Sequence, residues 1–477
     1  MILKRFYDET LAQASYLVGC DHTGDAIIID PNRDLEQYVA AATAEKVRIV
    51  YVTETHIHAD FVSGSRELAR HTGATLLLSD EGGPDWRYRY ATAEGATLLH
   101  DGDTIDVGRV RITVLHTPGH TPEHLTFLVT DRASANVPVA AITGDFIFAG
   151  DVGRPDLLER AANIGGTMEA SARLLFRSLQ RFKQQPEYLQ LWPGHGAGSA
   201  CGKALGAVPS TTLGYERIAN WAFGIDDEEE FVRRVLEGQP EPPRYFATMK
   251  HINRDGPSVR GGGGAPTRAS LAMVERAKAS GAWLVDIRPT PNFIAGHMPG
   301  FVHIPLNKSY TNWMGSLVPY DRDVVLLAES ESAAMRGVKL ASLIGLDRII
   351  AWCGTDQLEE YAATRGPLSS VAEEDITVMA NGARATTNVV DVRAQSEWDG
   401  GHIPGASHRF LGTLLEQTRE LPRDEPVAVH CAGGSRSAIA ASLLEANGFT
   451  NVTNLRGGFG AWKAANLPVV VPNEENA

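Results

Sequence analysis

Two histidines and an aspartate alternate at His56, His58 and Asp60, directly after the apolar segment 49–52. Imidazole nitrogens and carboxylate oxygens are common ligands of transition metals. Alternate positions just beyond a strand place such groups on a rigid support. The spacing therefore predicts metal ligands at the end of a strand.

Three more candidate ligands follow in the chain. They are His120 in Thr-Pro-Gly-His, Asp145 in Thr-Gly-Asp and His195 in Trp-Pro-Gly-His, and each lies in a turn after an apolar run. A lone histidine is most simply a packed or solvent-facing side chain. Together with the alternating residues, these markers predict one metal site assembled from several loops.

A second kind of chemistry is indicated near the C-terminus. The apolar segment 427–429 leads through His430 into the loop Cys431-Ala-Gly-Gly-Ser-Arg436, and residues 438–444 then form a helical run. Successive backbone N–H groups, a helix N-terminus and an arginine lower the pKa of a thiol and bind anions. Cys431 is expected to be a nucleophilic thiolate, with Arg436, Gly433, Gly434 and Ser435 binding the substrate.

The elements that position these groups fall into several domains, since 477 residues far exceed one domain of about 150. Pro-rich 239–243 and Gly-rich 260–266 indicate a connector, and small and acidic residues gather at 366–375. We expect a first domain at 1–245, a linker at 246–266, and further domains at 267–365 and 366–477. In the first domain, the pattern predicts strands at 26–30 and 49–53 and a helix at 65–71.

The two later domains are repeats of one α/β unit. Val-Asp-Ile-Arg at 285–288 matches Val-Asp-Val-Arg at 390–393, and Gly-His-Met-Pro-Gly at 296–300 matches Gly-His-Ile-Pro-Gly at 401–405. Both pairs lie 105 positions apart, and later matches lie 103 apart. Through the second offset, Cys431 and Arg436 align with Ala328 and Ala333, so the first copy lacks both reactive groups.

The overall charge argues against two classes of partner. With 44 Lys and Arg against 58 Asp and Glu, the net charge is -14, which disfavours nucleic acid and anionic membrane surfaces. No run of about 18 apolar residues and no signal-peptide pattern occurs. Four cysteines without paired spacing favour a reducing compartment, so we expect a cytoplasmic protein.

The series His-x-His-x-Asp, Pro-Gly-His, Gly-Asp and Pro-Gly-His resembles the metallo-β-lactamase superfamily over most of residues 1–245. That resemblance implies an αββα sandwich. Binuclear zinc hydrolases of the superfamily usually have a histidine where this chain has Phe61. The remaining His56, His120 and Asp145 match the two-histidine, one-carboxylate set of non-haem iron oxygenases, which predicts one Fe(II) per chain.

This combination looks like the persulfide dioxygenase branch, which oxidises a thiol persulfide with O₂ to sulfite. The resemblance implies that His56, His120 and Asp145 are the metal ligands and that His58, Asp60 and His195 orient them. Arg154, in Gly-Arg-Pro-Asp, is then a candidate for binding the substrate anion. Pairing with a nearby carboxylate is an equally good interpretation of this arginine.

The last domain resembles rhodanese sulfurtransferases, on the Asp391-Val-Arg, Gly401-His-Ile-Pro-Gly and Cys431-x4-Arg436 motifs and the segment 454–462. Related phosphatases use a longer Cys-x5-Arg loop. The resemblance implies transfer of sulfane sulfur through Cys431, linking sulfite and thiosulfate. The predicted architecture is thus multidomain α/β, with a metallo-β-lactamase sandwich followed by an inactive and an active rhodanese-like domain.

Several alternatives stay open. Cys201, six residues after His195, is either structural or a persulfide acceptor; Cys20 and Cys353 are expected to be structural. The protein as a whole is predicted to act in sulfide detoxification on small-molecule persulfides with O₂, sulfite or thiosulfate, as a homo-oligomer, and its carrier thiol is open. A zinc-dependent glyoxalase-II-like thioester hydrolase and a sulfur-carrier or redox-sensing module are the competing hypotheses.

Overall fold

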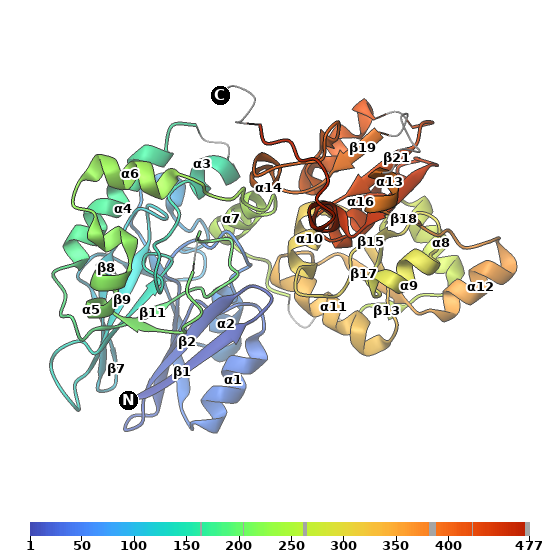
Figure 1. Cartoon of the computed structure of the whole chain (residues 1–477). Helices are drawn as coiled ribbons and strands as arrows, with labels where there is room; N and C mark the ends of the chain where they lie inside the picture. The colour runs from blue at the N-terminus through green and yellow to red at the C-terminus, as the bar shows by residue number, and fades with distance from the viewer. Residues whose placement is uncertain (163–164, 204, 261–264, 381–387, 422, 473–477) are drawn as a thin grey trace. The chain divides into compact units, whose positions relative to one another are not determined.

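The computed structural model describes residues 1–162, 165–203, 205–260, 265–380, 388–421 and 423–472. The chain divides into two compact units (Figure 1), Met1–Gly263 with Ser342–Gly345 and Gly264–Ala341 with Leu346–Ala477. Among the described residues, no helix is both long and apolar enough to span a membrane.

The first unit contains two six-stranded sheets, ordered β1-β2-β3-β4-β5-β6 and β12-β11-β10-β9-β8-β7. The first sheet comprises β1 (Ile2–Asp8), β2 (Gln13–Cys20), β3 (Asp25–Ile29), β4 (Arg48–Thr53), β5 (Thr75–Ser79) and β6 (Thr97–Leu99). The second comprises β7 (Thr104–Val107), β8 (Val110–His116), β9 (Leu125–Asp131), β10 (Ala140–Gly144), β11 (Gln190–Pro193) and β12 (Thr211–Thr212). The helices of this unit are α1 (Leu35–Ala44), α2 (Ser65–Thr72), α3 (Leu157–Ala162), α4 (Met168–Phe182), α5 (Leu213–Ala219), α6 (Glu228–Leu236) and α7 (Phe246–Asp255).

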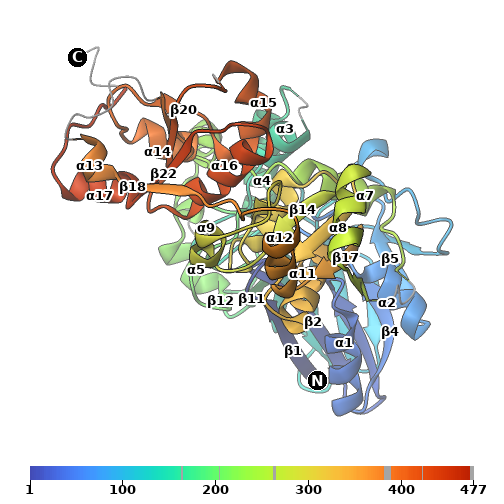
Figure 2. The same ribbon diagram turned by 90° about the vertical axis from the view of Figure 1, so that its right-hand side faces the viewer.

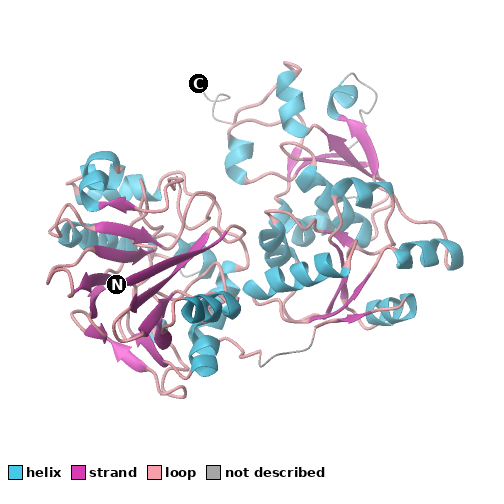
Figure 3. Ribbon diagram, turned by 90° about the horizontal axis from the view of Figure 1, so that it is seen from below, coloured by secondary structure: helices cyan, strands magenta, loops and turns pink. Residues whose placement is uncertain are grey.

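Alternation along the buried strands makes this unit four layers thick. Side chains such as Val18 and Phe127 lie in the core between the two sheets. Their neighbours Leu17 and Leu128 point to the opposite faces, where α1 and α2 cover the first sheet and α4 and α6 cover the second. Strands in the interior and helices outside are visible in Figure 3.

Part of the expected linker is a packed helix. Residues Phe246–Asp255 form α7, in which Phe246, Met249 and Asn253 are buried. The Asn253 side chain donates to the backbone carbonyls of His58 and Phe61, both at 2.7 Å. Helix α7 therefore belongs to the first unit and supports the His56 loop. Residues 261–264 of the expected linker lie outside the described residues.

The second unit repeats one five-stranded parallel sheet. The strand orders are β13-β17-β16-β14-β15 and β18-β22-β21-β19-β20, which are the same order shifted by five strands. The first repeat comprises β13 (Thr267–Arg268), α8 (Leu271–Ala279), β14 (Trp283–Asp286), α9 (Thr290–Ala295), β15 (Val302–His303), α10 (Tyr310–Leu317), β16 (Val324–Leu327), α11 (Glu331–Leu343), β17 (Ile349–Cys353) and α12 (Asp356–Thr364). The second comprises β18 (Ala372–Asp375), α13 (Ile376–Ala380), β19 (Asn388–Asp391), α14 (Gln395–Asp399), β20 (Ser407–His408), α15 (Leu414–Gln417), β21 (Val427–His430), α16 (Ser435–Ala446), β22 (Val452–Arg456) and α17 (Gly458–Ala464).

Equivalent buried ion pairs hold the two repeats in the same conformation. Arg288 donates to both carboxylate oxygens of Asp286 and to the carbonyl of Gly296. Arg393 makes the same contacts with Asp391 and the carbonyl of Gly401. Each pair joins the end of a strand to the following turn, as expected for residues that determine the fold.

Helix α16 is buried on every side, because residues 437–444 are all buried. It packs against β21 and β22 of its own repeat, as Figure 2 shows for β22, and against β15 of the other repeat. The Ser442 hydroxyl accepts the backbone N–H of His303 at 2.9 Å. The first repeat therefore covers one face of the helix that starts at the Cys431 loop.

Candidate metal centre and sulfur-transfer loop

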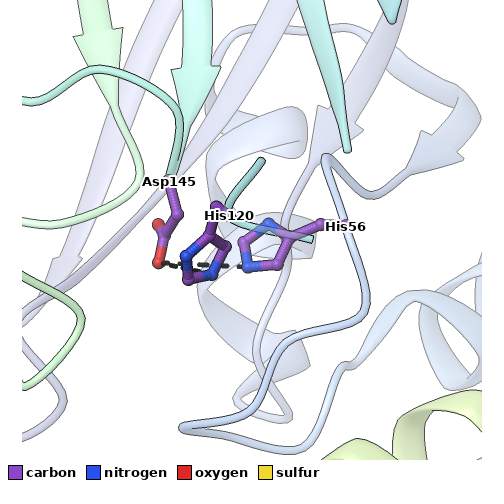
Figure 4. A group of neighbouring side chains, drawn as sticks. All are labelled: His56, His120 and Asp145. Atoms are coloured by element: carbon purple, nitrogen blue, oxygen red, sulfur yellow. Dashed lines mark ion pairs between the residues drawn. The ribbon is translucent and has the colours of Figure 1, made fainter. Parts of the chain in front are cut away.

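Three loops of the first unit bring His56, His120 and Asp145 together. These residues follow β4, β8 and β10, and their ligand atoms all lie within 4.8 Å of one another. The Asp145 Oδ2 atom is 3.5 Å from His120 Nε2 and 3.9 Å from His56 Nε2. Figure 4 shows the two imidazoles and the carboxylate pointing toward a common point.

Hydrogen bonds on the far side of each ring fix which nitrogen faces this point. His120 Nδ1 donates to the carbonyl of Arg154 at 3.1 Å. The Thr55 hydroxyl donates to Asp30, so it accepts from His56 Nδ1 at 2.9 Å. Both Nε2 atoms are left as lone-pair donors, and burial lowers the pKa of both imidazoles. Neutral imidazoles with anchored Nδ1–H groups are suited to metal binding.

The carboxylate of Asp145 is fully buried, and neither oxygen has a hydrogen-bond partner among the described residues. A buried carboxylate without partners costs several kcal/mol, by the order of magnitude of charge burial, unless a cation faces it. The residues present therefore fit a metal ion at this point.

His124 supports the same site, although no motif in the sequence singled it out. Its Nε2 accepts the backbone N–H of Asp145 at 3.1 Å, and its Nδ1 bonds the Thr117 hydroxyl at 2.9 Å. The ring stacks on His56 with centroids 5.1 Å apart. His124 thus holds in place both the backbone of Asp145, directly after β10, and the ring of His56.

His58 is not one of the three grouped ligands, and its Nε2 pairs with Asp30 at 3.1 Å. Burial alone would lower the pKa of His58. The carboxylates of Asp30, Glu54 and Asp60 have the larger, opposite effect and raise this pKa to about 9. The neighbouring Phe61 is fully buried, and its ring lies 4.4 Å from the His58 ring. The position that follows Asp60 therefore contributes an apolar wall instead of a ligand.

Asp60 and His195 lie beside the three candidate ligands. His195 Nε2 is 3.3 Å from Asp60 and 3.5 Å from Asp145. Cys201 joins them, because the ligand atoms of Asp60, His195 and Cys201 lie within 4.8 Å of one another.

In the second unit, the Cys431 sulfur lies in a cradle of hydrogen-bond donors. It accepts the backbone N–H of Gly434 at 3.0 Å and the hydroxyl of Ser437 at 3.6 Å. Burial raises the pKa of the thiol, but hydrogen bonds from Ser437, Gly434 and Gly433 outweigh burial and hold it below the usual value. Cys431 therefore has the environment of a nucleophilic thiolate.

The first turn of α17 fixes this loop from the other side. Phe459 N–H donates to the carbonyl of Cys431 at 2.7 Å, and Gly460 N–H donates to that of Ala432. At Gly458 a Cβ atom would lie 2.2 Å from the Cys431 carbonyl oxygen, so the position requires glycine. Arg436 is bound by both oxygens of Glu397 at 2.5 and 2.8 Å.

Comparison with known proteins gives matches in both units. Residues 9–195 match the family described as the metallo-beta-lactamase superfamily, and residues 270–352 and 376–465 match the rhodanese-like domain. A metallo-beta-lactamase from Staphylococcus aureus, known from a crystal structure, shares 38% sequence identity with this chain. The structural alignment has a TM-score of 0.67 and covers 74% of this chain and 99% of that one. The chain belongs to the metallo-β-lactamase superfamily. It carries rhodanese-like domains after its metallo-β-lactamase fold, as the sequence predicted.

Curated relatives in the superfamily have different activities. The mitochondrial persulfide dioxygenase ETHE1 of Bos taurus is 29% identical over 34% of this chain and 59% of its own length. A hydroxyacylglutathione hydrolase of Polaromonas is 30% identical over 51% of this chain and 93% of its own length. The chain therefore spans little more than half of the bovine enzyme, and family membership alone does not choose between oxidation and hydrolysis.

Within the metallo-β-lactamase domain, Arg154 is fully buried and is held by protein partners. It donates to both oxygens of Asp156 at 3.0 and 2.8 Å, and to the carbonyls of Ala200 and Pro240. These bonds occupy four of the five N–H donors of the guanidinium. The structure favours pairing with a carboxylate over the anion-binding interpretation, and Arg154 ties three loops together.

The rhodanese-like repeats differ at the active loop. In the first repeat, Ala328 directly follows β16 and Ala333 lies in α11, so neither a thiol nor a guanidinium occupies these positions. Glu329 of the same loop accepts a hydrogen bond from Asn292 at 2.6 Å. The first repeat thus keeps the fold and lacks the groups for sulfur transfer.

All four cysteines are free and buried. Burial, followed by the carboxylates of Asp60 and Asp145, raises the pKa of the Cys201 thiol well above its usual value. Asp145 is a candidate metal ligand and Asp60 lies beside it, so Cys201 adjoins the candidate metal centre, and its role as a persulfide acceptor stays a prediction. The thiol favoured for sulfur transfer is Cys431.

Proposed function

We propose that this protein is a non-haem iron persulfide dioxygenase coupled to a sulfurtransferase. It oxidises a thiol or inorganic persulfide with O₂ to sulfite, and it transfers sulfane sulfur through Cys431. The observation that carries the proposal is the ligand set of His56, His120 and Asp145 beside Phe61. Two imidazoles, one carboxylate and an apolar neighbour suit one Fe(II) per chain with open positions.

Ferrous iron held by these residues would supply a centre that accepts O₂ and a sulfur substrate together. The chain supplies the rest of the site. The Asp30–Thr55–His56 hydrogen bonds and the His120–Arg154 hydrogen bond hold both rings in one orientation. The buried ring of Phe61 and the buried His58 limit water around the site.

In the rhodanese-like domain, the Cys431 thiolate attacks the sulfane sulfur of a donor. A sulfur–sulfur bond forms at Cys431, and the donor leaves as a thiol or as sulfite with the electron pair of the broken bond. Sulfite that attacks the outer sulfur of the Cys431 persulfide gives thiosulfate and restores the thiolate. We propose that the anionic reactants are held by Gly433, Gly434 and Ser435, mainly through backbone N–H groups of this loop.

The cellular setting belongs to the same proposal. Persulfide, O₂ and sulfite or thiosulfate are proposed as its partners, with sulfide detoxification as its role. Four free thiols fit a reducing cytoplasm. We also propose a homo-oligomer, which the mass of the protein in solution tests directly.

A thioester hydrolase with zinc is the second candidate, because the Polaromonas relative is a hydroxyacylglutathione hydrolase. That activity needs no O₂ and leaves Cys431 without a partner reaction. A sulfur-carrier or redox-sensing protein would hold a persulfide on Cys431 but consume no O₂. Measuring O₂ uptake and thioester hydrolysis on the same preparation separates the three.

Two substitutions test the coupled reaction. His120→Ala removes one metal ligand and should abolish persulfide-dependent O₂ uptake. Cys431→Ser should leave O₂ uptake unchanged and turn the product from thiosulfate into sulfite. An unchanged thiosulfate yield from Cys431→Ser would contradict the coupling.

A further inference from the structure

Arg436, the arginine of the sulfur-transfer loop, is paired with a carboxylate from outside the loop. Its two terminal nitrogens donate to the two oxygens of Glu397 at 2.5 and 2.8 Å. Glu397 lies in α14, and one of its oxygens also accepts the backbone N–H of Ala394 at the start of that helix, at 3.1 Å. Both side chains are partly exposed. The pair therefore lies at the surface of the loop, with its carboxylate held from two sides.

The same arginine also interacts with the thiol of the loop. The hydrogen bonds with Glu397 are the largest influence on the pKa of Arg436 and raise it, and the charge of Cys431 acts in the same direction. Burial would raise the pKa of Glu397, but the hydrogen bonds and charge of Arg436 outweigh burial and hold it below its usual value. Both groups are therefore charged at neutral pH, and the carboxylate offsets the positive charge of the guanidinium.

The first repeat lacks both members of this pair. Through the 105-residue offset Glu397 aligns with Asn292, and through the 103-residue offset Arg436 aligns with Ala333. Asn292 donates to Glu329 at 2.6 Å, so its amide makes a different contact. The repeated fold therefore does not require a glutamate at this position, and the glutamate occurs in the repeat that carries the arginine and the thiol.

We propose that Glu397 is a positioning residue that biases the Cys431 loop towards persulfides and against thiosulfate as sulfur donors. This inference rests on the proposed sulfur transfer through Cys431. A persulfide group carries at most one negative charge, whereas thiosulfate carries two. Backbone N–H groups of the loop serve either donor, but the second charge of thiosulfate needs a cation that is not already paired. Glu397 binds both terminal nitrogens of Arg436, and its own charge repels a dianion.

The sulfur-transfer step is the same for either donor. The Cys431 thiolate attacks the outer sulfur, so that a sulfur–sulfur bond forms at Cys431 while the sulfur–sulfur bond of the donor breaks. A protonated persulfide leaves as a thiolate and thiosulfate leaves as sulfite, each with the electron pair of the broken bond. Thiosulfate that forms at the loop as a product meets the same charges as thiosulfate that enters as a donor. Glu397 therefore limits inhibition by thiosulfate when the loop runs from persulfide to thiosulfate.

A single sulfur transfer to Cys431 tests this bias. Full-length protein is mixed without O₂ with thiosulfate or with the persulfide of 2-mercaptoethanol, whose carrier is uncharged. Samples are alkylated at timed intervals, and mass spectrometry of the Cys431 peptide measures the persulfide formed there. The ratio of the rate constant for thiosulfate to that for the persulfide is compared between variants. Because both rate constants come from the same preparation, a smaller folded fraction lowers both equally and leaves the ratio unchanged.

Glu397→Gln keeps the shape of the side chain and removes its charge. We expect the ratio to rise about 10-fold, and the rise to shrink as salt is added, because its origin is electrostatic. Glu420→Gln is the matched control, since it removes a carboxylate of the same domain whose partner, Arg409, lies outside the loop. An unchanged or lower ratio in Glu397→Gln, a rise that salt does not reduce, or an equal rise in Glu420→Gln overturns the proposal.

Failure of the proposed function gives a different result. If Cys431 of the unmodified protein takes sulfur from neither donor, the proposed sulfur transfer itself is wrong. If Cys431 takes sulfur and Glu397→Gln leaves the ratio unchanged, only the role of Glu397 is wrong.

Discussion

The hydroxyl of Thr55 connects a candidate ligand to a buried carboxylate. It donates to Asp30 and accepts from His56 Nδ1, each at 2.9 Å. Thr55→Val removes this link and leaves the His56 ring free to turn. We expect metal binding at the first site to weaken by about 10- to 100-fold, as for other partners of metal-bound histidines.

Competition with a chelator measures that loss. Thr53→Val is the matched control, because its hydroxyl is also buried but bonds the carbonyl of Leu77 at 3.0 Å. Equal affinities for Thr55→Val and the unmodified protein would show that the Asp30–Thr55 link does not orient His56.

Arg154 and Arg160 provide a second pair of variants, since both contact Asp156. Arg154 is fully buried, whereas Arg160 is 40% exposed. Arg154→Ala removes the buried bidentate partner of Asp156, which keeps only the exposed Arg160, and takes a donor from the carbonyls of Ala200 and Pro240. We therefore expect the free energy of unfolding to fall by about 3–5 kcal/mol. Arg160→Ala should cost less than about 1 kcal/mol.

Denaturant unfolding of the metallo-β-lactamase domain in the full chain compares the two variants. If Arg154→Ala kept full stability and instead raised the KM for persulfide, Arg154 would be a substrate-binding residue after all.

Single site residues could be predicted from the sequence where a local motif fixes their position at the end of a strand. His56, His120 and Asp145 each follow an apolar run, and the ends of three strands meet in one place. The position of Arg154 depends on the carbonyls of Ala200 and Pro240, which no local pattern connects to it. The same holds for His124, whose role comes from a stacking contact and from the N–H of Asp145.

At the scale of elements, the Cys431 loop and the first turn of α16 act as one unit. The Ser437 hydroxyl donates to the sulfur and stabilises the thiolate relative to the thiol. Ser437→Ala should therefore raise the pKa of Cys431. Loss of a hydrogen bond worth about 1 kcal/mol corresponds to roughly 0.7 pH unit.

The pH dependence of alkylation measures this shift. The thiolate is the reactive form, so the midpoint for Ser437→Ala should move to higher pH. Ser442→Ala is the control on the same helix, because its hydroxyl donates to the carbonyl of Ile439. A midpoint that moves to lower pH, or that moves equally in both variants, would contradict this account of the loop.

Elements with clear boundaries were predictable. The strands expected at 26–30 and 49–53 are β3 (Asp25–Ile29) and β4 (Arg48–Thr53), and the expected helix at 65–71 is α2 (Ser65–Thr72). Helix α7 was missed because Pro-rich and Gly-rich segments flank it. The spacing of Phe246, Met249 and Asn253 on one helical face was the signal that could have identified it.

For the whole molecule, the repeat offsets in the sequence correctly indicated two copies of one sheet, and the strand orders match throughout. The role of the first copy could not be predicted from the sequence and follows from its contacts in the structure. Its β15 packs on α16, and Ser442 of α16 accepts the N–H of His303. A domain without Cys431 and Arg436 counterparts therefore contributes packing to the helix that carries the active loop.

The most direct test of the central claim uses the full-length protein loaded without O₂ with iron or with zinc. The iron form should consume O₂ only when a low-molecular-weight persulfide is added, with one O₂ consumed for each sulfite-derived product, and the zinc form should consume none. If no persulfide supported O₂ uptake by the iron form and the zinc form hydrolysed a thioester instead, the dioxygenase account would be contradicted.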